Sequence, residues 1–201
     1  MLQIEIKDLN KKYGKKKVLN NINITLSNDM YNIIVGANAS GKSTLVKCIN
    51  GVIEYDGFIN NHEYVISYCP DKVIFPEFIS LNNFLYLLEY CSTKKISDFK
   101  KKIDYYLELF KLQEFKNTPI IKLSLGSKQK ILIIQALIKD ADVYIFDEPL
   151  NGLDNESQKV FIDELKRLKE EEKLILIITH NISKYPLVNI NQIDLNYAWT
   201  N

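Results

Sequence analysis

The chain carries a glycine-bounded loop followed by a lysine and two hydroxyl residues, with the sequence GANASGKST at residues 36–44. The loop follows an apolar segment at 31–35, so the sequence predicts a strand, a tight turn and the start of a helix. Backbone N–H groups in this arrangement turn inward and bind phosphate oxygens. The predicted phosphate contacts are Gly36, Ala37, Asn38, Ala39, Ser40, Gly41, Lys42, Ser43 and Thr44.

Two side chains of this loop add chemistry to the backbone contacts. Lys42 brings a mobile cation to the β and γ phosphates of a nucleoside triphosphate, and Ser43 offers a hydroxyl to the accompanying Mg²⁺ ion. We expect Thr44 to open a helix whose buried face includes Leu45 and Val52. The alternative is a chance glycine turn with a lysine nearby, but the complete spacing after an apolar segment favours the phosphate loop.

Two adjacent carboxylates, Asp147 and Glu148, follow the apolar segment at 143–146. Acids at the end of a strand can divide the work of hydrolysis, with Asp147 facing Mg²⁺ or its water shell and Glu148 facing the attacking water. They can instead cap the next helix, although Pro149 delays that helix. With a phosphate loop upstream, the pair favours a hydrolytic centre.

His180 ends a second apolar run, which covers residues 174–178. An imidazole at the carboxyl end of a strand is well placed to contact a γ-phosphate or to orient water. Its position after the acidic strand favours this function over a structural or merely exposed histidine. His62 lacks that context and is expected at the surface. The candidate catalytic residues are therefore Lys42, Glu148 and His180.

The hydrophobic pattern predicts an α/β fold that positions these residues. Segments 2–6, 18–26 and 54–69 show interrupted apolar alternation, which is typical of antiparallel strands. The continuous apolar runs at 143–146 and 174–178 predict parallel strands that helices cover on both faces. We therefore expect a β lobe beside a parallel core sheet.

Helical periodicity separates the two kinds of strand. Apolar residues recur at helical spacing through 80–117, with Ser80 as an N-cap, which predicts an inserted helical segment. Residues 155–172 are predicted to form a crossover helix between the two parallel strands, with a surface pair of Asp163 and Arg167.

Composition excludes several classes of function. The chain has 201 residues, with 26 basic against 25 acidic residues and a net charge of +1, so no overall field attracts nucleic acid. Three dispersed cysteines, Cys48, Cys69 and Cys91, indicate reduced thiols in a cytosolic protein. We expect no signal peptide and no bilayer span. The densest basic cluster is expected to be a solvated turn, with a place near the phosphates as the alternative, and comprises Lys11, Lys12, Lys15, Lys16 and Lys17.

The segment LSLGSKQK at 123–130 resembles the LSGGQ signature of ATP-binding cassette proteins. The family's other motifs occur here in order: an aromatic residue at Tyr13, the phosphate loop, the acidic strand, a D-loop-like segment at 150–154 and the switch histidine His180. The resemblance implies a P-loop NTPase with a mainly parallel core sheet and an antiparallel β subdomain. It also implies a single domain over 1–201 with an inserted α-helical subdomain at about 72–125.

The resemblance also implies roles for individual residues. Tyr13 would stack on the adenine ring, and Ser124 and Gly126 would contact the γ-phosphate of ATP held by a second protomer. Asp154 would lie at the dimer seam. The implied cofactors are ATP and Mg²⁺, and the implied metal contacts are Ser43, Asp71 and Asp147.

For partners, the resemblance implies a second ATP-binding subunit in a homodimer and a separately encoded integral-membrane permease, with no nucleic acid. The chain would be cytoplasmic and peripheral on the inner face of the cell membrane, where it would power transport by hydrolysing ATP. Phe75, Phe78 and Ile79 would receive the permease, unless they belong to the core. The alternatives are a non-transport ABC ATPase and a weakly catalytic, ATP-dependent dimerisation switch.

Three positions depart from the family pattern. Leu125 stands where the signature usually has its first glycine, and Ser127 stands where it has glutamine. Asp71 replaces the glutamine of the Q-loop, where it would reach the metal through water or remain a solvated turn acid. Such departures are familiar in bacterial exporter and antimicrobial-peptide-resistance cassettes, so the resemblance favours export.

Overall fold

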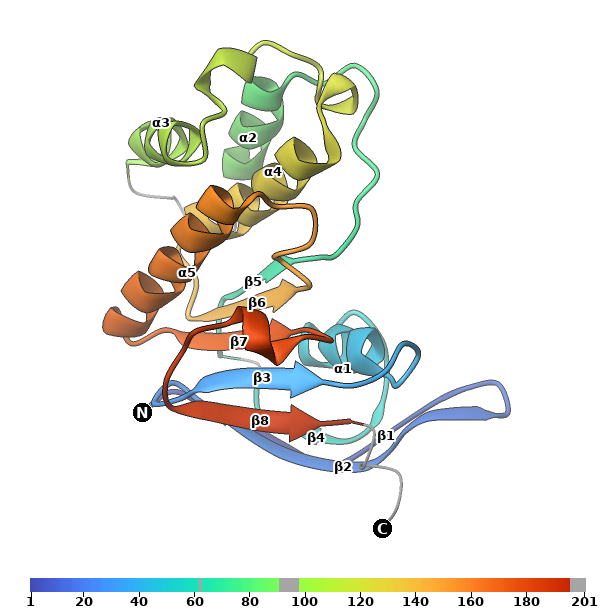
Figure 1. Ribbon diagram of the computed structural model, residues 1–201. Helices are drawn as coiled ribbons and strands as arrows, with labels where there is room; N and C mark the ends of the chain where they lie inside the picture. Colours follow the sequence, from blue (N-terminus) through green and yellow to red (C-terminus); the bar gives the residue numbers. More distant parts are fainter. Residues whose placement is uncertain (62, 91–97, 196–201) are drawn as a thin grey trace.

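The central sheet of the computed structural model, which describes residues 1–61, 63–90 and 98–195, has five strands (Figure 1). Their order is β5 (Ile66–Cys69), β6 (Val143–Asp147), β7 (Leu174–Ile178), β3 (Tyr31–Val35) and β8 (Ile190–Asp194). All neighbouring pairs run parallel. Every residue of β6 and β7 is buried, which confirms the prediction from their continuous apolar runs.

A second sheet is antiparallel and has the order β2-β1-β4. β1 (Gln3–Tyr13) and β2 (Lys16–Ser27) form a long hairpin that extends beyond the central sheet in Figure 1. β4 (Asp56–Ile59) pairs with the other edge of β1. The alternation at 2–6 and 18–26 therefore predicted these strands correctly.

The prediction of an antiparallel strand throughout 54–69 is wrong for its second half. β5 pairs in parallel with β6, with Ile66 opposite Val143, and so belongs to the central sheet. As an edge strand it buries Ser67 and Cys69 and leaves Ile66 and Tyr68 half-buried. This one-sided burial has the same period of two as a strand of an antiparallel sheet, so the pattern could not distinguish them.

α1 (Lys42–Ile49) joins the two sheets through a shared apolar core. The helix begins at Lys42, not at Thr44 as predicted. Leu45 is fully buried as expected, but Val52 is 70% exposed. The helix ends before Val52, and the chain turns through Gly51, whose φ of +65° breaks the helical spacing.

The opposite face of the central sheet is covered by α4 (Leu125–Ile138) and α5 (Asn155–Glu170) (Figure 1). Phe161, Leu165 and Leu168 of α5 are buried, as the crossover helix requires. Within the described residues, no helix combines the length and the apolar character needed to cross a membrane.

α2 (Leu81–Tyr90) and α3 (Phe99–Leu109) pack against α4 on the side away from the sheet (Figure 1). The Ser80 hydroxyl accepts a hydrogen bond from the Asn83 N–H at 3.3 Å, which agrees with an N-cap. After α3, two short 3₁₀ turns at Gln113–Phe115 and Ile120–Lys122 lead to α4.

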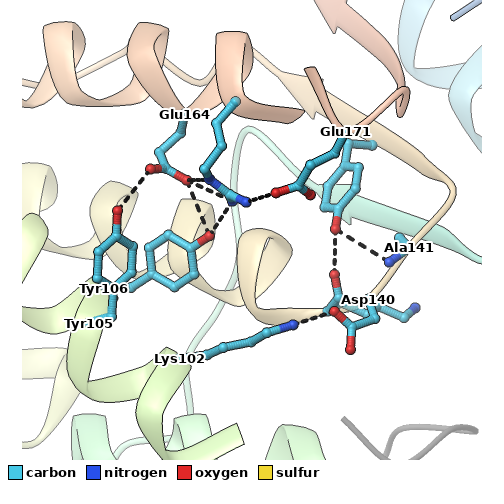
Figure 2. Close-up of polar contacts among 10 residues, drawn as sticks. Lys102, Tyr105, Tyr106, Asp140, Ala141, Glu164 and Glu171 are labelled. Atoms are coloured by element: carbon cyan, nitrogen blue, oxygen red, sulfur yellow. Dashed lines mark hydrogen bonds and ion pairs between the residues drawn. The ribbon is translucent and has the colours of Figure 1, made fainter. Parts of the chain in front are cut away.

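A buried polar network joins α3 to α5 (Figure 2). Glu164 is 5% exposed, and its carboxylate accepts hydrogen bonds from Tyr105 at 3.4 Å, Tyr106 at 3.2 Å and Arg167 at 3.0 Å. Burial and the Glu164 charge raise the pKa of Tyr106. The predicted pair of Asp163 and Arg167 is wrong, because the buried carboxylate needs the guanidinium as its partner.

Two of the three cysteines lie in the described part of the chain. Cys48 and Cys69 are buried thiols that form no disulfide. His62 and Cys91 lie outside the described residues.

Candidate active site

The phosphate loop, the acidic pair and His180 meet at one edge of the central sheet. β7 pairs with β6 on one side and with β3 on the other, and Ile178 lies opposite both Asp147 and Ile34. Because the three strands are parallel, the segments that follow them emerge together at their carboxyl ends. The fold thus brings the separate chemical motifs of the sequence into one place.

The phosphate loop has the backbone geometry expected from its glycines. Gly41 has a φ of +99°, and a Cβ added there would meet the Val18 carbonyl oxygen at 2.9 Å. A Cβ added at Gly36 would meet the Ser40 hydroxyl at 2.5 Å, so the Ser40 side chain would have to move. The Lys42 ammonium donates hydrogen bonds to the carbonyls of Gly36 at 2.7 Å and Ala37 at 2.8 Å. The loop is therefore closed around its own lysine at the N-terminus of α1.

Beside the loop lies a cleft of ≈ 350 Å³. Its lining combines loop residues and the start of α1 with three carboxylates and two residues of β2. Val18 was not predicted, and Lys16 lies where the alternative interpretation of the lysine cluster placed it, near the phosphate loop. The lining residues are Lys16, Val18, Asn38, Ala39, Gly41, Lys42, Ser43, Thr44, Asp71, Asp147 and Glu148.

The pKa of Asp147 is well above the ordinary value of an aspartate. Its pKa is raised from 3.8 to about 6, first because the side chain is buried and then because of the charges of Asp71 and Glu148. Lys42 opposes this shift. A bound cation would relieve the same repulsion.

The donors in the cleft fit Mg²⁺. They are oxygens only, from the Ser43 hydroxyl and the carboxylates of Asp71 and Asp147, and this hard ion prefers oxygen ligands and retains several waters. No group of three or more closely placed His, Cys, Asp or Glu side chains suited to a metal occurs in the described part of the chain. The site therefore suits an ion that is shared with phosphate and water and not one caged by protein.

Glu148 sits at a sharp turn and is tied to His180. Its φ is +48°, a left-handed conformation that is uncommon for a residue with a side chain. Its Oε1 lies 2.7 Å from Nδ1 of His180 and accepts a hydrogen bond from the His180 backbone N–H at 2.8 Å. The structure thus pairs the predicted general base with the predicted switch histidine.

Asp71 reaches the same cleft from the loop after β5. It is partly buried, and the Asn151 amide lies 3.5 Å from its Oδ1. Asp71 thus lines the cleft and contacts the segment after Glu148, and its contact with a metal stays a prediction. Its negative charge contributes to the raised pKa of Asp147.

Ser124 and Gly126 are not among the residues that line this cleft. Ser124 caps α4, with its hydroxyl accepting from the Ser127 N–H at 3.1 Å. Gly126 packs on the D-loop-like segment, where a Cβ would meet the Gly152 carbonyl oxygen at 2.7 Å. The structure therefore joins the signature segment to the D-loop-like segment, and no residue of either segment lines the cleft beside the phosphate loop of the same chain.

Tyr13 is also absent from the cleft lining. It lies at the tip of the β1-β2 hairpin with 47% of its surface exposed, and the Lys11 ammonium is 5.4 Å from the centre of its ring. Its partner across the hairpin is Lys16, which does line the cleft.

Residues 19–151 match the ABC transporter family model. An ABC transporter ATP-binding protein of Mycoplasma pneumoniae is 30% identical to the chain and covers 89% of it, whereas the chain spans only 59% of that protein's length. The zinc import ATP-binding protein ZnuC of Wigglesworthia glossinidia brevipalpis is also 30% identical, over 89% of the chain and 76% of its own length.

Solved structures share the fold. A structure described as the ATP binding subunit of an ABC transporter has a TM-score of 0.84 and 25% identity, covering 90% of this chain and 81% of its own. The dimeric structure of the bacterial ABC transporter cassette MJ0796 has a TM-score of 0.81 and 22% identity, covering 96% of this chain and 94% of its own. Both likenesses include the parallel core sheet, the antiparallel sheet and the helices.

Proposed function

The chain belongs to the ABC transporter family as an ATP-binding cassette and ABC ATPase, and from this premise we propose that it binds ATP with Mg²⁺ in the cleft beside Lys42 and powers a separately encoded membrane permease. One observation carries the proposal. The phosphate loop and the acidic pair line the same cleft, and Glu148 of that pair contacts His180.

The residues divide the chemistry among themselves. Lys42 and the N-terminus of α1 bind the phosphates, while Glu148 takes a proton from the attacking water. His180 orients Glu148 and contacts the γ-phosphate. Ser43, Asp147 and, through water, Asp71 would hold Mg²⁺, which supplies neutralising charge to the phosphate oxygens. Tyr13 receives the adenine ring once the Lys11 side chain, which also donates to the Glu54 carbonyl, moves aside.

We propose that the active unit is a homodimer. Ser124 and Gly126 do not line their own chain's cleft, and the neighbouring Leu125 is 78% exposed, so this segment is available to a second copy. The fold matches a cassette that is dimeric in its solved structure. Two ATP molecules would then join the subunits, and loss of the γ-phosphate would release them.

The proposed permease contact is an apolar groove along α2. Phe78 is 92% exposed and lines a hollow of ≈ 540 Å³ together with Ile79, Tyr86 and Leu87. Phe75 is only 8% exposed and packs edge-on against Phe84, so it belongs to the core. An unpaired apolar surface of this kind favours a protein partner. We assign the groove to the inserted helical subdomain at about 72–125.

For direction, we propose export from the cytoplasm, on the evidence of Asp71 and Leu125 in the two departing motifs. One of the relatives is a zinc import protein, so similarity to relatives does not favour export. The support for export comes from these two departures alone. The same departures favour a second candidate, a switch that dimerises on ATP but turns it over slowly. As the subunit of an exporter, the chain works with its permease at the inner face of the membrane.

One experiment separates the candidates. The chain is expressed with a candidate multi-span membrane protein chosen from its neighbouring genes, purified from membranes and reconstituted, and phosphate release is measured with ATP and Mg²⁺. Turnover that a metal chelator stops and the permease stimulates supports the transporter. ATP-dependent dimers without phosphate release support the switch, and a chain that never co-purifies with the membrane protein contradicts the permease proposal.

A further inference from the structure

Glu148 is fixed at both ends of its backbone. Its N–H donates to the Ile178 carbonyl at 2.9 Å, and its own carbonyl accepts from the Asn151 N–H at 3.1 Å. With φ at +48°, this peptide has little freedom to turn. The direction of the carboxylate is then decided by the groups that hold its two oxygens.

The two oxygens are held differently. Oε1 contacts the backbone N–H and Nδ1 of His180, whose side chain is 58% accessible to solvent. Oε2 accepts a hydrogen bond from the Thr179 hydroxyl at 3.3 Å. Thr179 is only 2% exposed, so its hydroxyl, unlike the imidazole, cannot turn away into water.

The Thr179 hydroxyl is itself oriented. It accepts a hydrogen bond from the Asn181 N–H at 3.1 Å, while the Thr179 N–H donates to the Ile34 carbonyl of β3 at 3.0 Å. A hydroxyl has one proton, which Thr179 donates to Oε2 of Glu148 while its oxygen accepts from the Asn181 N–H. The buried Tyr185 hydroxyl also lies beside the Thr179 side chain and near the Glu148 charge.

We propose that Thr179 is a positioning residue, which sets the plane of the Glu148 carboxylate so that it faces the attacking water even when the His180 ring moves. The inference rests on the proposed role of Glu148 as the base. Thr179 touches neither nucleotide nor water in this scheme and acts only through Glu148. Its loss therefore slows turnover and leaves ATP binding unchanged.

The test compares Thr179→Val, which keeps the shape and removes the hydroxyl, with Thr179→Ser, which keeps the hydroxyl. We expect kcat of Thr179→Val to fall about tenfold, as for the loss of one hydrogen bond to a charged group, with KM for ATP unchanged. Thr179→Ser should restore most of kcat. Ser67→Ala is the matched control, because it removes another buried hydroxyl of the same sheet, one bonded to the Ala136 carbonyl far from Glu148.

The outcomes separate this inference from the proposed function. A kcat for Thr179→Val equal to that of the unchanged chain would overturn the positioning role alone. So would a rise in KM, or a loss of kcat that Thr179→Ser does not repair, since either indicates general damage to the fold. If the unchanged chain releases no phosphate from ATP, the proposed function fails first and the inference fails with it.

Discussion

Oε1 of Glu148 lies 2.8 Å from the backbone nitrogen of His180 and 2.7 Å from its Nδ1, although the two residues are 32 positions apart in the chain. The contact exists because β6 and β7 are parallel neighbours and both residues follow the ends of their strands. A carboxylate and an imidazole in contact beside a phosphate loop form a unit suited to activating water.

Glu148→Gln should retain ATP and stop its hydrolysis. The amide keeps the shape and can still accept a hydrogen bond but cannot accept a proton from water, so we expect turnover to fall by about 100-fold or more. Phosphate release and calorimetric ATP binding measure the two effects. Glu170→Gln, on the exposed end of α5, is the control and should change neither. Unchanged turnover in Glu148→Gln would remove this residue as the base.

Lys42→Ala should weaken ATP binding. The ammonium spans the phosphate loop through the Gly36 and Ala37 carbonyls and is the loop's only cation, so its loss removes charge-assisted contacts worth about tenfold or more in affinity. Lys47→Ala, an exposed lysine on the same helix, serves as the control. Equal dissociation constants for the two variants would refute the phosphate role of Lys42.

Asp147→Asn should stabilise the nucleotide-free protein at neutral pH. Because the pKa of Asp147 is about 6 in the fold and near 3.8 when unperturbed, the folded chain keeps a proton that the unfolded chain loses between these values. Stability therefore falls as pH rises from about 4 to 6, by on the order of 3 kcal/mol. Asparagine has no charge to bury, so Asp147→Asn does not lose this stability as the pH rises.

Urea denaturation at pH 4 and pH 8 checks this prediction. The gain from Asp147→Asn should be present at pH 8 and nearly absent at pH 4, while Glu77→Gln, an exposed change, should have no effect at either pH. A variant that is less stable than the unchanged chain at pH 8 would contradict the burial of a repelled charge at Asp147.

Glu164→Ala should destabilise the fold by about 2 kcal/mol, because it leaves the Tyr106 hydroxyl without its buried acceptor, whereas Arg167 keeps its contacts with Tyr106 and Glu171 (Figure 2). Its neighbour provides a matched control. Asp163→Ala removes only an exposed pair with Lys166 and should cost less than about 1 kcal/mol. Similar losses for the two variants, measured by urea denaturation, would show that the α3-α5 network contributes little.

The sequence predicted those parts of the site whose functional residues lie close together in the chain. The phosphate loop, the Asp147-Glu148 pair and His180 each combine a distinctive residue type with an apolar strand before it. Parallel strands then bring such segments together whatever their distance along the chain. For this reason, the sequence could predict the cleft that the phosphate loop shares with the acidic pair, and the position of His180 against Glu148.

Other features depend on tertiary contacts that no local pattern records. Lys16 enters the cleft because β2 passes close to Gly41 at the start of α1, whereas the cluster of five lysines that contains it favoured a solvated turn. Thr179 reads as one more residue of an apolar strand until its hydroxyl is seen against Glu148. β5 is buried on one face only, so its buried residues alternate with a period of two. This alternation occurs in parallel and in antiparallel sheets and does not distinguish them.

The central claim is that ATP joins two copies of this chain through Ser124 and Gly126. Light scattering of Glu148→Gln with ATP and Mg²⁺ tests it most directly. The account predicts a dimer with ATP, a monomer with ADP, and a monomer with ATP when Leu125→Glu is added, with calorimetric ATP binding retained in that variant. A chain that binds ATP in calorimetry yet stays monomeric at every protein concentration would contradict the account.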